Sequence, residues 1–165
     1  MTGFHRRLAT PLPWVLGLVA AVLIAFASNG PWARASTTAV VVYKTPTCGC
    51  CSLWVDHLRQ NGFEVEVHDV RDTTPMRRRE GVPARLGSCH TATVGGYAIE
   101  GHVPAAEIKR LLRERPRVDG LAVPGMPIGS PGMEMGSRQD AYEVLAFNSA
   151  GETTVFARYP QEKRK

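Results

Sequence analysis

The chain has 165 residues, of which 44% are hydrophobic, and its 20 Lys and Arg residues against 15 Asp and Glu residues give a net charge of +5 at pH 7. This length and apolar content suffice for one domain with a buried core. The basic excess lies largely at the two ends, in Arg6, Arg7, Arg34 and the tail 163–165. Nucleic-acid binding requires a basic patch on the folded domain, so no nucleic-acid partner is expected.

The first 35 residues are organised like a signal peptide for export. His5, Arg6 and Arg7 precede an apolar run over residues 12–27, and Ala33-Arg34-Ala35 supplies a small-residue cleavage site. The run is shorter than the roughly 20 residues of a membrane-spanning helix. Cleavage after Ala35 is therefore expected, with an uncleaved membrane anchor as the alternative. Residues 36–165 would then form a single domain in an oxidising compartment, the bacterial periplasm.

The next part of the chain predicts a strand, a cysteine loop, a helix and a second strand. Residues 39–43 form a short apolar run rich in Val, which is typical of a buried strand. From Cys51 onward apolar residues recur at helical spacing until Asn61-Gly62 ends the helix. Residues 63–68 alternate apolar and polar side chains, which indicates a half-buried strand. Strand, helix and strand in this order favour a parallel crossover unit.

The middle of the chain predicts a hairpin followed by a helix. The run 77–79 is three arginines in a polar stretch and is interpreted as a solvated helix face. Residues 91–94 and 97–100 predict two short strands joined at Gly95-Gly96. Pro104 then opens a helix with one apolar side. The order β-α-β-α-β-β-α predicts an α/β protein with a thioredoxin-like fold.

A segment rich in Gly, Pro and Met interrupts this pattern from Gly120 to Gly136. Prolines and glycines alternate there, so the segment is not expected to form a regular helix or a central strand. Residues 121–139 are therefore predicted to be a loop. Residues 142–147 and 153–158 predict a C-terminal β-hairpin within residues 140–160.

Cys48, Cys50 and Cys51 lie where the first strand gives way to the helix, and Cys89 precedes the third strand. Thiolates are favoured at a helix N-terminus. One hypothesis is a structural disulfide between Cys48 and Cys51, since adjacent Cys50 and Cys51 lie too close along the chain for an ordinary bridge. A second is a thiol–disulfide oxidoreductase that uses the Cys48/Cys51 pair.

Metal binding is the third hypothesis, and it uses all four thiols if Cys89 reaches the cysteine loop. In thioredoxin-like folds the segment that enters the third strand packs beside that loop. Spacing alone leaves zinc and iron–sulfur clusters open, but the crowded Cys-x-Cys-Cys run suits bridging thiolates better than one tetrahedral site. Soft thiolates select copper(I) most naturally.

Two further residue types are candidate accessory ligands. Met126, Met133 and Met135 lie close together in the Gly/Pro/Met segment, and thioethers are soft donors. A single Met more often fills a gap in a core. His90, next to Cys89, and His102, at a helix entrance, are candidate ligands or hydrogen-bond partners of ligands.

Several sequence segments together resemble the CopG copper-resistance family, the periplasmic metal-binding proteins and not the ribbon-helix-helix repressors of the same name. The segments are Tyr43-Lys44-Thr45-Pro46-Thr47-Cys48-Gly49-Cys50-Cys51, Gly81-Val82-Pro83, Ser88-Cys89-His90-Thr91, Gly95-Gly96-Tyr97, Glu100-Gly101-His102-Val103-Pro104, Pro124-Gly125-Met126-Pro127 and Gly129-Ser130-Pro131-Gly132-Met133-Glu134. The resemblance extends over about residues 43–156.

The resemblance implies a thioredoxin-like fold and a role in periplasmic copper resistance. It also implies a cysteine-bridged site that holds several copper ions on Cys48, Cys50, Cys51 and Cys89, and an interconversion of copper(I) and copper(II). Besides copper ions, a copper exporter or a multicopper oxidase is an expected partner. Contact with the membrane is expected only through an uncleaved leader.

Overall fold

The computed structural model describes residues 39–160, so the predicted signal peptide and the tail 163–165 lie outside the described residues. The elements run in the order β1 (Val40–Lys44), α2 (Gly49–Gln60), β2 (Val65–Asp69), α3 (Thr74–Arg79), the 3₁₀ helix η1 (Ala84–Leu86), β3 (Thr91–Val94), β4 (Tyr97–Glu100), α4 (Ala105–Glu114), β5 (Gly120–Ala122), β6 (Tyr142–Phe147) and β7 (Thr153–Tyr159). The chain is a mixed α/β protein. None of the helices within 39–160 combines the length and apolar character that crossing a membrane requires.

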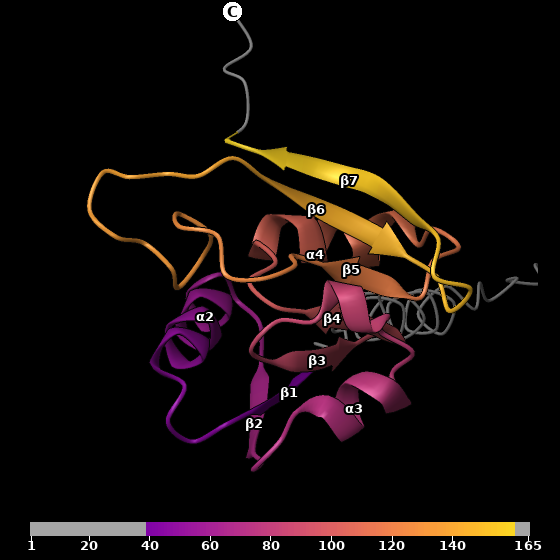
Figure 1. Ribbon diagram of the computed structural model, residues 1–165, viewed down its shortest axis with the longest axis horizontal. Helices are drawn as coiled ribbons and strands as arrows, with labels where there is room; N and C mark the ends of the chain where they lie inside the picture. Colours follow the sequence, from indigo (N-terminus) through magenta and orange to yellow (C-terminus); the bar gives the residue numbers. More distant parts are fainter. Residues whose placement is uncertain (1–38, 161–165) are drawn as a thin grey trace, which may run out of the picture. The chain divides into compact units, whose positions relative to one another are not determined.

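One seven-stranded sheet organises the domain, with the strand order β2-β1-β3-β4-β5-β6-β7 (Figure 1). Strand β1 pairs in parallel with β2, which confirms the predicted crossover unit around α2, and antiparallel with β3. The predicted β3–β4 hairpin is confirmed and turns through Gly95 and Gly96, whose φ angles are 58° and 89°. Two successive positive φ angles are typical of a type I′ turn, which glycine adopts without steric cost.

Helices cover both faces of the sheet. The main core lies between one face and helices α2 and α4, and its largest buried side chains are Trp54, Leu58, Ile99, Ile108, Leu111 and Leu121. A second, smaller core lies where the segment carrying α3 and η1 meets the opposite face, and it consists of Val82, Leu86, Ala98, Ala122 and Phe147. Alternate residues of β4 and β5 therefore point into different cores, as the two-residue period of a strand requires.

The prediction that no central strand begins at Gly120 is wrong for its first three residues. Gly120–Ala122 form β5, which is fully buried and lies between β4 and β6. These residues precede the first proline of the segment, so their amides remain available for the sheet. The Gly/Pro/Met loop therefore begins after Ala122. The C-terminal hairpin is confirmed as β6 and β7, and it extends the same sheet.

Gly120 occupies a position where a side chain does not fit. A Cβ atom there would lie 2.0 Å from the carbonyl oxygen of Ala98 and 2.7 Å from Cζ of Phe147. We therefore expect Gly120→Ala to lower the free energy of unfolding by about 2 kcal/mol, as overpacking of a core commonly does. Urea denaturation measures the change. Gly49→Ala is the matched control, because no atom lies within 4 Å of a Cβ at position 49; equal stability of the two variants would contradict the prediction.

Candidate metal centre

Three of the four cysteines lie at the N-terminus of α2. The sequence predicted a cysteine loop with a helix from Cys51 onward, but the helix begins at Gly49 and Cys48 is its N-cap. Cys50 and Cys51 therefore belong to the first turn, where unpaired amides and the helix dipole favour negative sulfur. Cys51 is buried, whereas Cys48 and Cys50 are half-buried.

Cys48 and Cys51 are joined by a disulfide bond, with their Cα atoms 5.3 Å apart. This is the pair that the disulfide and oxidoreductase hypotheses both used. Cys50 and Cys89 are free thiols. Sγ of Cys50 lies 3.5 Å from Sγ of Cys48 and donates to it, because a disulfide sulfur has no proton of its own. The oxidised pair and a free thiol therefore share one helical turn.

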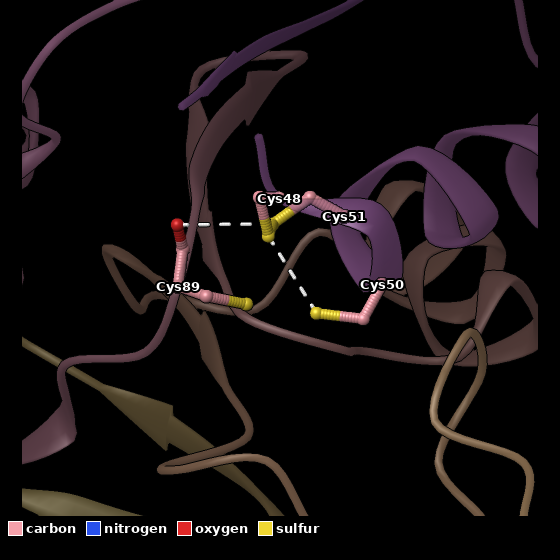
Figure 2. A group of neighbouring side chains, drawn as sticks. All are labelled: Cys48, Cys50, Cys51 and Cys89. Atoms are coloured by element: carbon pink, nitrogen blue, oxygen red, sulfur yellow. Dashed lines mark hydrogen bonds between the residues drawn. A yellow bond between two sulfur atoms is a disulfide. The ribbon is translucent and has the colours of Figure 1, made fainter. Parts of the chain in front are cut away.

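Cys89 comes from a distant part of the chain and meets these three sulfurs, as the metal hypothesis required. The register pairs Tyr43 at the end of β1 with Thr91 at the start of β3, so the segments beyond both strands lie at the same edge of the sheet. The Sγ atoms of Cys48, Cys50, Cys51 and Cys89 all lie within 4.8 Å of one another. Figure 2 shows Cys89 facing the cysteines of α2 across this space. These four residues are called the cysteine cluster below.

A buried ion pair holds the residue that precedes Cys89. Glu100 has no exposed surface, and its Oε1 accepts from Nε of Arg77 at 2.8 Å and from the Ser88 amide at 2.7 Å. Arg77 in turn donates through Nη2 to the Ser88 carbonyl oxygen at 2.6 Å. The other carboxylate oxygen of Glu100 accepts from Oγ1 of Thr91 at 2.7 Å. The pair thus fixes both polar groups of the Ser88 backbone, which places Cys89.

The interpretation of residues 77–79 as a solvated helix face is wrong for Arg77. Its side chain is 15% exposed and forms an ion pair with the buried carboxylate of Glu100. Arg79 does remain at the surface, where its side chain is 54% exposed. No local pattern indicates this pairing, because Arg77 and Glu100 are far apart along the chain and Glu100 ends a strand whose pattern is otherwise ordinary.

Two buried histidines lie beside Cys89. Sγ of Cys89 is 3.1 Å from Nε2 of His102 and 3.4 Å from Nδ1 of His90. These three residues form a second group with one possible ligand atom each, all within 4.8 Å of one another. Both imidazoles have no exposed surface. The structure therefore brings both predicted accessory histidines to Cys89.

Burial keeps the Cys89 thiol protonated in the metal-free protein. Desolvation, with a smaller contribution from the negative charge of Cys50, raises the pKa of Cys89 to about 12. Burial and the positive charge of His102 lower the pKa of His90 to about 3, and burial also lowers the pKa of His102. Neutral imidazoles can ligate a metal, whereas Cys89 must release its proton to do so.

The Gly/Pro/Met loop packs directly on the helix that carries the cysteines. A Cβ at Gly132 would lie 2.7 Å from the Cys50 carbonyl oxygen and 2.8 Å from the Trp54 amide, so only glycine allows this approach. Met126 and Met135 are 52% and 62% exposed, which excludes the core-filling role that was the alternative for them. Met133 is half-buried. Ligation by these three thioethers stays a prediction.

These features define a mixed α/β protein with four cysteines gathered at a helix N-terminus. Residues 86–133 match the profile of a family described as a protein of unknown function, DUF411. A search of curated proteins finds no match. Two solved structures described as copper resistance protein CopG are similar to this chain. Form 2 is 50% identical, with a TM-score of 0.71, and the match covers 74% of this chain and 98% of that one.

The second structure, form 1, is 51% identical with a TM-score of 0.71, and the match covers 75% of this chain and 98% of the other. This identity over nearly the whole length of both structures shows a common family. The chain belongs to the CopG copper-resistance protein family. The resemblance predicted from the sequence is thereby confirmed.

Removing the charge of Glu100 leaves the largely buried guanidinium of Arg77 without a partner. We expect Glu100→Gln to lower the free energy of unfolding by about 3 kcal/mol, because the lost partner of a buried ion pair is not replaced by water. Chemical denaturation of the oxidised, metal-free protein measures this. Glu66→Gln is the control, since the Glu66 side chain is 59% exposed in its pair with His68. A Glu100→Gln change no larger than the Glu66→Gln change would refute the argument.

The raised pKa of Cys89 predicts slow alkylation. In the folded protein, the rate of iodoacetamide labelling at Cys89 should keep rising with pH beyond 9, because the thiolate fraction grows until the pH reaches about 12. In urea the rate should level off near an ordinary thiol pKa of about 8.5. Mass spectrometry of the peptide that contains Cys89 follows the reaction. A plateau near pH 9 in the folded protein would show that burial does not raise this pKa.

Proposed function

We propose that this protein binds copper for copper resistance and holds several copper(I) ions in a site bridged by Cys48, Cys50, Cys51 and Cys89. The observation that carries the proposal is the convergence of these four sulfurs within 4.8 Å of one another. Membership of a family whose solved structures are described as copper resistance proteins supports copper as the metal. Soft sulfur donors favour copper(I) over harder cations.

The number of ions follows from the crowding of the sulfurs. Three cysteines occupy one N-cap and one helical turn, and two of their sulfurs lie 3.5 Å apart without any metal. Sulfurs so close together are better suited to bridging, in which each thiolate binds two copper ions, than to one tetrahedral site around a single ion. The fourth sulfur, from Cys89, closes the group on the side away from α2. More than one copper(I) ion per chain is therefore expected.

The disulfide makes copper binding dependent on reduction. Two electrons must reach the Cys48–Cys51 bond before four thiolates are available. The same two electrons can be exchanged with two copper ions, because copper(I) and copper(II) differ by one electron. Two copper(II) ions that take one electron each from two thiolates become copper(I) and leave a disulfide, and the reverse reaction returns two thiolates and two copper(II) ions. This exchange is how the site would interconvert copper(I) and copper(II).

The fold of the core, the cellular location and the protein partners are part of the same proposal. We infer a thioredoxin-like core from β1 to α4, because a parallel crossover unit is followed by an antiparallel hairpin and a helix, with the cysteines at the first helix N-terminus. The leader over residues 1–35 supports export to the periplasm. The exposed thioethers of Met126 and Met135 are soft donors at which a copper exporter or multicopper oxidase would exchange copper.

A thiol–disulfide oxidoreductase is the second candidate function. The specific observation in its favour is the Cys48–Cys51 disulfide at the start of α2, with Cys48 half-buried and within reach of a partner thiol. Exchange chemistry of this kind needs two sulfurs. It does not explain why Cys50 and Cys89 lie beside them.

Titration with copper(I) under strict exclusion of oxygen tests the copper proposal. The fully reduced protein should bind more than one ion per chain tightly, and the disulfide form should bind at least tenfold more weakly because half of its sulfurs are withdrawn. Cys89→Ser should abolish binding of more than one ion. Ser149→Ala, in the turn between β6 and β7, is the control. Failure of the reduced wild-type protein to bind copper would end the proposal.

The same Cys89→Ser variant separates the two candidate functions. If the protein works by simple exchange at Cys48 and Cys51, its rate of reaction with glutathione disulfide should survive the change. Loss of copper capacity with unchanged copper-free exchange assigns Cys89 to the metal site. Unchanged copper capacity would favour the oxidoreductase.

A further inference from the structure

The first amide of helix α4 is held by a side chain of another helix. The N–H of Ala105, the first residue of α4, donates to Nε2 of His57 on α2 at 3.1 Å. The first amides of a helix need such partners, because no carbonyl precedes them within the helix. Pro104, the N-cap of α4, forms no side-chain capping bond. His57 therefore caps α4 from across the core, in place of the usual Ser, Thr, Asp or Asn at the N-cap itself.

The capped amide lies where water does not replace a lost partner. Ala105 is 1% exposed, so its N–H would remain buried and unpaired without His57. A second bond fastens the same connection, because Nε1 of Trp54 donates to the carbonyl oxygen of Val103 at 2.9 Å. Trp54 and His57 are three residues apart and lie on one side of α2. Helix α2 thus holds the connection between β4 and α4 at two points.

The bond from Ala105 requires a neutral imidazole. Because an amide N–H only donates, Nε2 of His57 must be unprotonated, and the ring proton is on Nδ1. A charged ring has a proton on both nitrogens, so it would direct N–H against N–H beside the positive end of α4. Burial lowers the pKa of His57 below its ordinary value, and the negative charge of Glu134 opposes this shift. His57 is half-buried, so protons from solvent can reach it.

A carboxylate on the Gly/Pro/Met loop lies beside the same part of α2. Oε2 of Glu134 accepts from the Gly132 amide at 2.8 Å. Gly132 packs on α2 so closely that a Cβ there would lie 2.8 Å from the amide nitrogen of Trp54. Trp54 precedes His57 by about one helical turn. Glu134 is therefore placed to attract a positive charge on His57.

The other charged groups around His57 are engaged elsewhere. Asp56 and Arg59, its neighbours on α2, form an ion pair with each other. Glu107, in the first turn of α4, accepts from a tyrosine hydroxyl of β7 and pairs with an arginine of its own helix. Within residues 39–160, Glu134 is thus the carboxylate available to a protonated His57.

We propose that His57 is an acid-sensitive clamp: the neutral ring holds the entrance of α4 against α2, and the protonated ring releases Ala105 and pairs with Glu134. One proton thereby moves the side chain from the β4–α4 connection to the Gly/Pro/Met loop. The clamp acts in the metal-free, disulfide-bonded protein, so it does not depend on the proposed copper function.

The released connection borders the cysteine cluster. His102 lies three residues before Ala105 on this connection, and its Nε2 is 3.1 Å from Sγ of Cys89. The pKa of His57 is lower in the folded protein than in the unfolded chain, so the clamp stabilises fully above about pH 6.5. Its contribution is lost as the pH falls through the lowered pKa. Acid therefore loosens one wall of the site without a change in its sulfurs.

Nuclear magnetic resonance of the oxidised, metal-free wild-type protein tests the clamp. From about pH 7.5 to about pH 4.5, the Cε1 proton of His57 reports the charge of the ring, and the Ala105 amide reports the hydrogen bond. We expect both signals to titrate with one midpoint below about pH 6.5. Hydrogen-exchange protection of the Ala105 amide should fall about tenfold across that midpoint. An Ala105 amide that stays protected after His57 is protonated would overturn the proposal.

His57→Gln keeps the hydrogen bond but removes the titration. The glutamine Oε1 takes the place of Nε2 and accepts at every pH, so the Ala105 amide should stay protected in acid. His68→Gln is the matched control, because the His68 side chain is 44% exposed on β2, and its acid loss of protection should persist. Equal loss in both variants would show that another group causes it. Near-ultraviolet circular dichroism checks that the variants fold; if one does not, the wild-type titration decides.

Glu134→Gln tests the second partner. The midpoint of His57 should move to lower pH, because the charge that favours the protonated ring is lost. Glu66→Gln is the control, since Glu66 pairs with His68 and should leave this midpoint unchanged. A His57 midpoint in Glu134→Gln that equals or exceeds the wild-type midpoint would refute the pairing with Glu134.

Discussion

The site depends on the antiparallel register between β1 and β3. That register pairs Tyr43 with Thr91, so the turn after β1 and the segment before β3 end at one edge of the sheet. This register brings Cys89 to the cysteines at the start of α2. The Arg77–Glu100 ion pair then sets the finer position, since it holds both backbone polar groups of Ser88. Strand pairing brings the fourth sulfur near, and a buried charge pair keeps it there.

The disulfide and the proposed copper site are alternative states of the same sulfurs. Cys48 and Cys51 cannot be bonded to each other and also act as two independent thiolates. Cys89 is protonated without metal because its burial penalises the thiolate, so a metal ion that binds there must displace a proton as well. In the proposed site, copper occupancy is therefore coupled to the oxidation state of one cysteine pair and to the protonation of another thiol. The sequence contained both possibilities but could not show which sulfurs were joined.

The regular elements could be predicted from the sequence because their signals are local. The Val-rich run of β1, the Gly95-Gly96 turn and the apolar side of α4 each depend on a few neighbouring residues. The short strand β5 was missed because three residues without a proline were grouped with the proline-rich segment that follows. Its identity as a strand comes from pairing with β4 and β6, which is not a local property.

The same distinction between local signals and long-range contacts applies to the candidate site. The four cysteines and both histidines were identified by residue type and spacing, and the structure brings them together in two groups that share Cys89. The role of Arg77 was missed because its partner lies at the end of β4, and a charge in a basic run gives no sign of being buried. The carbonyl of Pro131 is likewise visible only in three dimensions, although it determines which nitrogen of His102 faces Cys89.

X-ray absorption at the copper edge, on fully reduced protein loaded with copper(I), tests the central claim most directly. The account predicts that sulfur dominates the nearest shell and that a second copper atom scatters at short range, because thiolates bridge the ions. A nearest shell of nitrogen and oxygen with no neighbouring copper would contradict it. That result would mean that the four converging sulfurs are not the site at which this protein holds copper(I).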